Sequence, residues 1–219
     1  VSLGENNPSI APPADVHSAA DWHEFASHLG LSCSDDCSPE MRFFAPSATR
    51  ARKLREKMVR DGYAQVDAWS DDAWLQRNAQ QFCTAIDRLD AAGLPAVFLL
   101  VFDEVWAAVL SLKAVLEPIF GHDLTFDFYV FNVRAGGTGW GMHRERAGAD
   151  AKASFDAKSG LPAYNTVWWS LTEASPATSC MYALPAGADP HYSCARDAPR
   201  DARADDADIG ALVADGHRK

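Results

Sequence analysis

Hydrophobic residues recur every three to four positions through most of the first half of the chain, which is the spacing of one face of an α-helix. This spacing predicts four helices, over residues 18–30, 47–61, 70–93 and 95–116. Ser18 is a candidate N-cap of the first helix, and Gly30 and Gly62 are candidate stops for the first two. Pro118 and Gly121 mark the expected end of the fourth helix.

Apolar residues alternate with a period of two in the second half, as they do along a β-strand. The alternation predicts strands over residues 124–133, 165–173 and 179–187. Helices followed by strands are typical of an α+β arrangement. We divide the chain into an extended arm with a short helix, a main domain and an Ala/Asp/Arg-rich tail, at residues 1–46, 47–192 and 193–219.

The formal net charge of −10 argues against a non-specific nucleic-acid binder, which needs a basic surface toward phosphates. The basic run at 50–60 fits the solvated face of a helix, with a local binding patch as the alternative. The five cysteines are an odd number and include no CxxC pair, so they specify neither a disulfide framework nor a zinc site. Cys33 and Cys37 either pair in an oxidising compartment or remain thiols.

The most apolar stretch, residues 94–112, is interrupted by Asp103 and Glu104, which favours a core helix over a membrane span. The sequence begins with Val1 and shows no signal-peptide pattern, so a targeting segment has been removed or the sequence is shortened. We therefore expect a soluble protein of the cytoplasm or an organelle interior.

One short stretch, "GWGMHRERAG" at 139–148, carries candidate metal chemistry. His143 and Glu145 stand two positions apart, so on a strand both side chains point to the same face. An imidazole and a carboxylate together are two thirds of a non-haem iron site. The pattern predicts metal binding there and raises the question of a third ligand.

Three stretches in order, "LPAVFLLVFDEVW", "FGHDLTFDFYVFNVRAGGTGWGMHRER" and "YNTVWWSLTEASPATSCMYALPAGADPHY", resemble the phytanoyl-CoA dioxygenase-like iron(II)/2-oxoglutarate oxygenases. The resemblance covers roughly residues 50 to 215 and implies a double-stranded β-helix (jelly-roll) core with flanking N-terminal helices. It also implies that His143 and Glu145 are iron ligands. Trp169 corresponds to a tryptophan near the 2-oxoglutarate cosubstrate, and Trp168 should face the other way.

The chain departs from the family pattern in ways that bear on activity. "PATSC" stands where members usually have Asn-Gly-Cys. The family also has a second histidine ligand on a later strand, followed about ten residues on by an arginine. His217 is the one candidate for that histidine, and two residues follow it in this sequence, too few for the arginine. The resemblance then implies an incomplete jelly roll, and a protein that serves as a non-catalytic accessory subunit of a larger assembly. Other protein subunits would cover the incomplete sheet. Any association with a membrane complex would be peripheral. The alternative is an active oxygenase of a small apolar or acyl substrate whose remaining residues are absent from this sequence.

Overall fold

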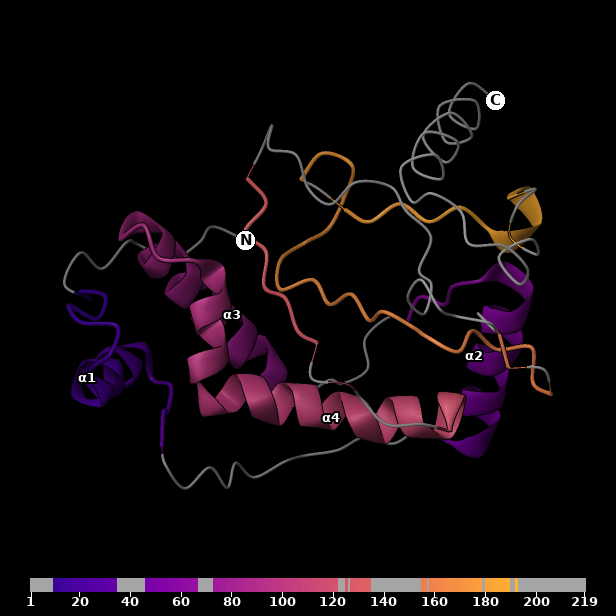
Figure 1. Cartoon of the computed structure of the whole chain (residues 1–219), viewed down its shortest axis with the longest axis horizontal. Coiled ribbons are helices and arrows are strands. Elements are labelled where there is room, and N and C mark those ends of the chain that lie inside the picture. Colours follow the sequence, from indigo (N-terminus) through magenta and orange to yellow (C-terminus); the bar gives the residue numbers. More distant parts are fainter. Residues whose placement is uncertain are drawn as a thin grey trace.

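The structure, a computed structural model, describes residues 10–34, 46–66, 73–121, 125, 127–134, 155–156, 158–178, 180–189 and 192. These residues form four α-helices and two 3-10 helices, which are α1 (Ala19–Leu29), α2 (Ala48–Asp61), α3 (Ala73–Ala91), η1 (Ala96–Val101), α4 (Asp103–Phe120) and η2 (Ala186–Ala188). Figure 1 shows α4 as the long central helix, with α1 and α3 toward one of its ends and α2 at the other. The first three of the four helices predicted in the first half of the chain are thus confirmed.

Local signals set the ends of the first two helices as predicted. The Ser18 hydroxyl accepts a hydrogen bond from the Asp21 N–H at 3.2 Å, which caps the start of α1. α1 ends at Gly30, whose φ of 67° is the left-handed conformation that glycine adopts without strain. α2 ends in the same way at Gly62, where a Cβ would lie 3.1 Å from the Tyr192 ring.

The helix predicted over 95–116 is in fact two helices, which meet at Phe102. The Asp103 N–H donates to the Ser32 carbonyl oxygen at 2.9 Å, and the Asp103 carboxylate accepts from the Ser34 N–H and hydroxyl at 3.1 and 2.9 Å. The Glu104 carboxylate accepts from the Ser32 N–H and hydroxyl. Two acidic residues at the positive end of a helix dipole also suit the start of a helix. The chain therefore restarts as α4 here because of a contact with the distant segment after α1.

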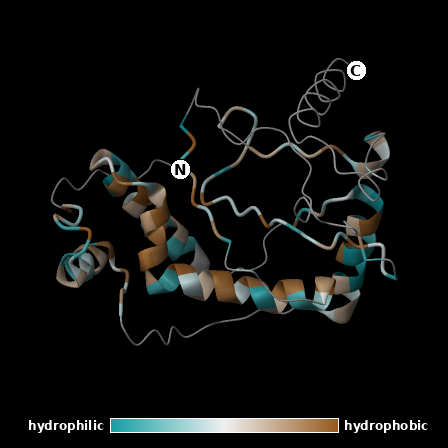
Figure 2. Ribbon diagram, in the orientation of Figure 1, coloured by the Kyte–Doolittle hydropathy of each residue, from teal (hydrophilic) through white to brown (hydrophobic). Residues whose placement is uncertain are grey.

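The larger of two hydrophobic cores lies where α1, α3, η1 and the start of α4 meet. Its fully buried side chains are Phe25, Phe82, Leu89 and Phe102. Figure 2 shows the hydrophobic positions gathered along α3 and the adjoining part of α4. Gln81 of α3 adds a polar link, since its Nε2 donates to the Leu29 and Gly30 carbonyl oxygens at 3.1 and 2.9 Å. α1 is thereby fixed to α3 by its C-terminal end.

The smaller core joins α2 to the far end of α4. It contains the buried side chains of Ala51, Val115 and Ile119, with Leu54 and Phe120 packed against them. At the edge of this core, Arg55 donates from Nε to the Ile119 carbonyl and from Nη2 to the Pro118 carbonyl, both at 2.9 Å. A guanidinium thus satisfies two of the carbonyl groups that the last turn of α4 leaves without helical partners.

The predicted double-stranded β-helix, and with it the α+β class, is wrong for the part of the chain that the structure describes. Residues 127–134, 158–178 and 180–185 contain no β-strand there, and the one bridge with both partners described joins Phe155 and Pro162. In the first two of these segments, Phe128, Val130, Trp169 and Leu171 instead pack against the helices. The alternation in the sequence reports this packing against helices, which a jelly roll would have replaced by sheet-on-sheet packing.

We predict that Arg55→Met destabilises the protein by about 1 kcal/mol, because two charge-assisted hydrogen bonds to the end of α4 are lost while the apolar stem is kept. Arg52→Met is the matched control on the same helix, since Arg52 makes only an exposed pair with Glu56 at 3.9 Å. That change should cost less than about 0.5 kcal/mol. Urea unfolding followed by circular dichroism measures both, and equal losses would show that the Arg55 contact does not hold α4.

Candidate functional site: an exposed apolar set

The candidate iron ligands His143 and Glu145 lie outside the described residues, and so does His217. In the part of the chain that is described, no three His, Cys, Asp or Glu side chains come together as a metal-binding group. Because His143 and Glu145 lie outside the described residues, the structure does not test the predicted site, and we derive no chemical step through iron. Of the predicted site residues, Trp169 is the one whose position the structure gives.

Trp169 packs inward against α3. Its ring lies edge-on to Phe82, with 6.4 Å between ring centroids and an interplanar angle of 86°. Leu171, two residues on, also packs against the larger core, and its carbonyl oxygen accepts from the Cys83 thiol at 3.8 Å. Burial raises the pKa of that thiol, with the nearby Asp87 carboxylate adding to the shift. Trp169 thus anchors segment 165–171 to the helices, and its role beside a cosubstrate stays a prediction.

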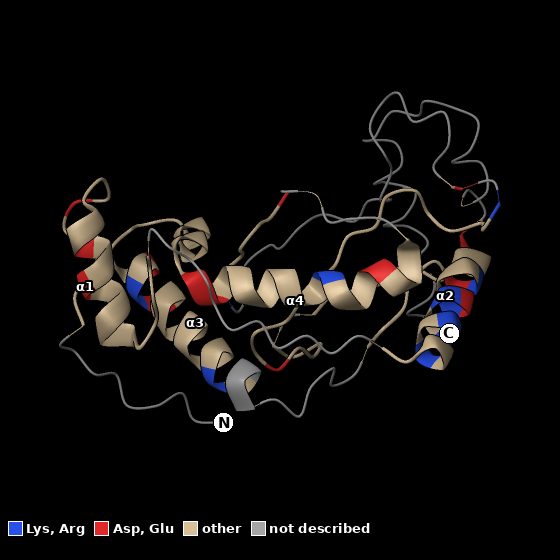
Figure 3. Ribbon diagram, turned by 90° about the horizontal axis from the view of Figure 1, so that it is seen from below, with Lys and Arg blue, Asp and Glu red and all other residues tan. Residues whose placement is uncertain are grey.

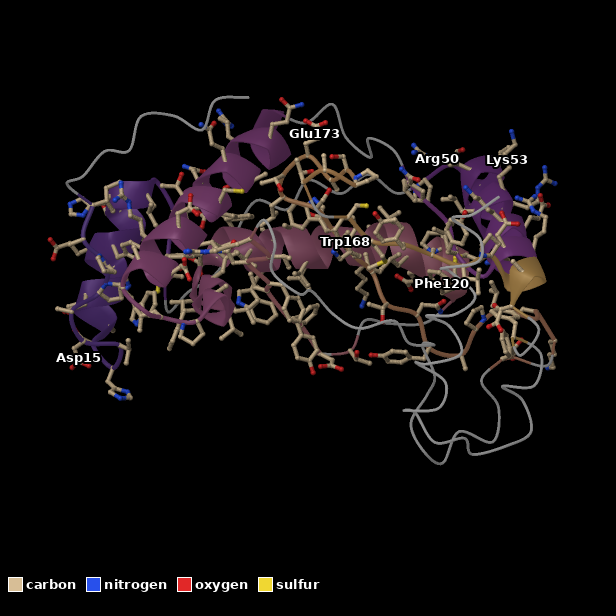
Figure 4. All side chains as sticks on the ribbon, turned by 90° about the horizontal axis from the view of Figure 1, so that it is seen from above. Asp15, Arg50, Lys53, Phe120, Trp168 and Glu173 are labelled. Atoms are coloured by element: carbon tan, nitrogen blue, oxygen red, sulfur yellow. The ribbon has the colours of Figure 1, made fainter. Side chains whose placement is uncertain are left out.

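Trp168 lies on the opposite side of the same segment and is 48% exposed. The prediction that the two neighbouring tryptophans face different ways is therefore confirmed. Figure 4 shows Trp168 in the middle of the molecule, over α4. An indole with half its surface in water is uncommon, because burying such a side chain is worth several kcal/mol.

Residues 127–131 repeat this arrangement. Phe128 faces the helices, where its ring lies edge-on to Trp106 at 5.5 Å, and Val130 packs against the larger core. Tyr129 and Phe131 point outward, stacked at 5.9 Å with an interplanar angle of 17°. They are 66% and 57% exposed. The segment thus has one face on the protein and an equally apolar face toward solvent.

The outward side chains form what we call the exposed apolar set, which consists of Tyr129, Phe131, Trp168, Met181 and Tyr182. All five side chains are about half exposed or more. They come from three segments that follow α4, all in the part of the chain that Figure 1 shows crossing between α3 and α2. Single exposed apolar residues are ordinary on a protein surface, whereas large exposed side chains that lie together, as Tyr129 and Phe131 do, are candidates for a binding surface.

A carboxylate lies at one edge of this set. Asp127 accepts a hydrogen bond from the Tyr164 hydroxyl at 3.5 Å. Its carboxylate also raises the pKa of Tyr129, first through a hydrogen bond and then through its charge, since both favour the protonated phenol. The ring of Tyr129 is therefore exposed to solvent while its hydroxyl is hydrogen-bonded to Asp127. Tyrosine is among the residue types enriched in protein interfaces.

The sequence contained a signal for this surface that the strand prediction did not use. In "FDFYVFNV" both phases of the alternation are apolar, with Tyr129, Phe131 and Val133 in one phase and Phe128 and Val130 in the other. A strand with one face in water should be polar in one phase. Two apolar phases indicate that both faces are covered, and the helices cover only one of them.

No protein-family model, curated protein or solved structure matches this chain. Within the described ranges, the helices also lack the combination of length and apolar character that crossing a bilayer requires. The site must therefore be interpreted from its own residues.

We predict that Trp169→Ala costs about 2–3 kcal/mol, because it removes a ring packed against Phe82 and leaves space in the core. Trp168→Ala, its immediate neighbour, should change the free energy of unfolding by less than about 0.5 kcal/mol, because its exposed ring makes little core contact. Denaturant unfolding of the two variants makes the comparison. A larger loss for Trp168→Ala would mean that the segment packs with the other face inward.

Proposed function

We propose that this protein is a non-catalytic subunit of a larger assembly, and that a protein partner covers the exposed apolar set. The observation that carries the proposal is the solvent exposure of Tyr129, Phe131 and Trp168 on segments whose other face is already packed on helices. Leaving such surface in water forgoes about 25 cal/mol for each Å² that a partner would bury. The assembly would lie in the cytoplasm or in an organelle, with peripheral contact to a membrane complex if it meets one.

A protein suits this surface better than the other classes of ligand. The net charge of −10 opposes nucleic acid and anionic lipid surfaces. Aromatic residues and methionine are the types enriched at the centre of protein interfaces, and tyrosine and tryptophan often dominate their binding energy.

A photo-crosslinking amino acid placed at position 131 or 168 should join the protein to one discrete partner in its native extract. The control position is Val97, a 45% exposed apolar residue on η1, outside the set. Crosslinking there should give no adduct. The partner, identified by mass spectrometry and purified, should bind the wild-type chain directly, and the double variant Phe131→Ser/Trp168→Ser should bind at least about tenfold more weakly.

Two results would contradict the proposal. One is an identical set of adducts from all three positions, which indicates general stickiness of the chain. The other is a purified chain that is a stable monomer and turns over 2-oxoglutarate, since that activity belongs to an enzyme and needs no partner.

A second candidate function, iron(II)/2-oxoglutarate-dependent oxygenation, rests on the sequence resemblance alone. Its support in the sequence is the His143–Glu145 pair together with the three stretches that resemble the family and follow one another in the same order along the sequence. The described residues do not form the jelly roll that the resemblance implies, so the candidate keeps only the His143–Glu145 pair as its support.

We expect metal analysis of the purified chain, incubated anaerobically with ferrous iron and desalted, to give well under one equivalent of iron, because two protein ligands hold iron weakly. The variant His143→Ala serves as the matched control and should retain equally little iron. One equivalent in the wild type that falls in the variant would instead favour the oxygenase function. Copurification of a partner would leave this measurement unchanged, so the two candidate functions are tested separately.

A further inference from the structure

The basic run in the sequence folds as α2, and four of its cations fall in one stripe. Arg50, Lys53, Lys57 and Arg60 are spaced i, i+3, i+7 and i+10, which places them along one side of the helix over roughly 15 Å. α2 carries six basic and two acidic side chains in a chain of formal net charge −10. Figure 3 shows the blue positions gathered on α2, at the opposite end of the molecule from α1.

The stripe sits on a helix that is fixed in place. Ala51 and Met58 are buried and Leu54 packs on the smaller core, so another side of α2 is turned toward α4. Arg55 is held on the end of α4 by its two hydrogen bonds. The stripe is therefore preorganised, because the helix that carries it does not have to order when a ligand binds.

One cation of the stripe already has an acidic partner. Arg60 forms a two-point ion pair with Asp61, with both N–O distances at 2.7 Å. Lys57 lies over the Tyr63 ring, 5.7 Å from its centroid, so an aromatic surface adjoins the charge. Lys53 is exposed, and Figure 4 shows Arg50 and Lys53 on α2 at this end of the molecule.

We propose that this stripe binds an acidic helical segment of a partner protein. A helix that carries carboxylates at the same i, i+3, i+7, i+10 spacing has the same rise between charges, so its carboxylates align with the stripe, where Arg60 is already paired with Asp61. A nucleic acid fits less well, because a long polyanion also meets the negative field of the rest of the chain. This surface is separate from the exposed apolar set, and the inference does not depend on it.

The test measures binding of the full chain to three labelled probes by fluorescence anisotropy at low salt. One is a blocked alanine-based helical peptide with four glutamates at the spacing of the stripe, the second has the same composition with glutamates spread around the helix, and the third is a short single-stranded DNA of equal charge. We expect the first probe to bind tightest and its affinity to fall as salt is added. Lys53→Glu should weaken that binding about fivefold, and Arg52→Glu, which makes the same charge change off the stripe, less than about twofold.

Three outcomes overturn the proposal. Equal weakening by Lys53→Glu and Arg52→Glu would show that only net charge matters. Tighter binding of the DNA than of the aligned peptide would assign α2 to nucleic acid. Failure of every probe to bind at low salt would make the stripe a solvated helix face. Both variants lie on the exposed part of α2, and unchanged melting temperatures confirm that they are folded.

Discussion

The arrangement of the chain depends on how α4 is held at its two ends. At its start, Asp103 and Glu104 accept hydrogen bonds from Ser32 and Ser34, roughly seventy residues earlier in the sequence. At its end, Arg55 donates to the last carbonyl groups across a similar separation. Both contacts place opposite charge on the poles of the helix dipole. Because the segment after α1 contributes one contact and α2 the other, α4 fixes the distance between the two hydrophobic cores.

The candidate site follows from this helical frame. Phe82 and Trp106 provide the surfaces on which Trp169 and Phe128 pack, and each of these inward rings orders an irregular segment. Side chains alternate along an extended chain, so fixing one phase inward fixes the other phase outward. The outward positions of Tyr129, Phe131 and Trp168 therefore follow from the packing of Phe128 and Trp169 on the helices, and a partner that covers them binds to side chains already in position.

The sequence predicted the helices well because their signals are local. Ser18 and Gly30 mark the ends of α1 within a few residues of the helix they bound. The break at Phe102 was not predictable in this way, since it depends on Ser32. The prediction of strands was wrong for a related reason. Alternation shows which side chains share a face of the chain, and it carries no information about whether a neighbouring strand is there to pair with. His143 and Glu145 show the same limit, because a two-residue pattern is identical whether or not the fold brings a third ligand to it.

The two surfaces proposed for binding rely on different interactions. η2 packs against α2 and follows Met181 and Tyr182 by only a few residues, so these two members of the exposed apolar set are connected to the helix that carries the basic stripe. Burial of the aromatic residues would supply affinity that depends little on salt. The charges on α2 would instead act on the rate of encounter and on the orientation of the partner, and their effect falls with ionic strength. A single partner that used both would be an acidic protein with an apolar face, and its association rate would be sensitive to salt while its dissociation rate would not.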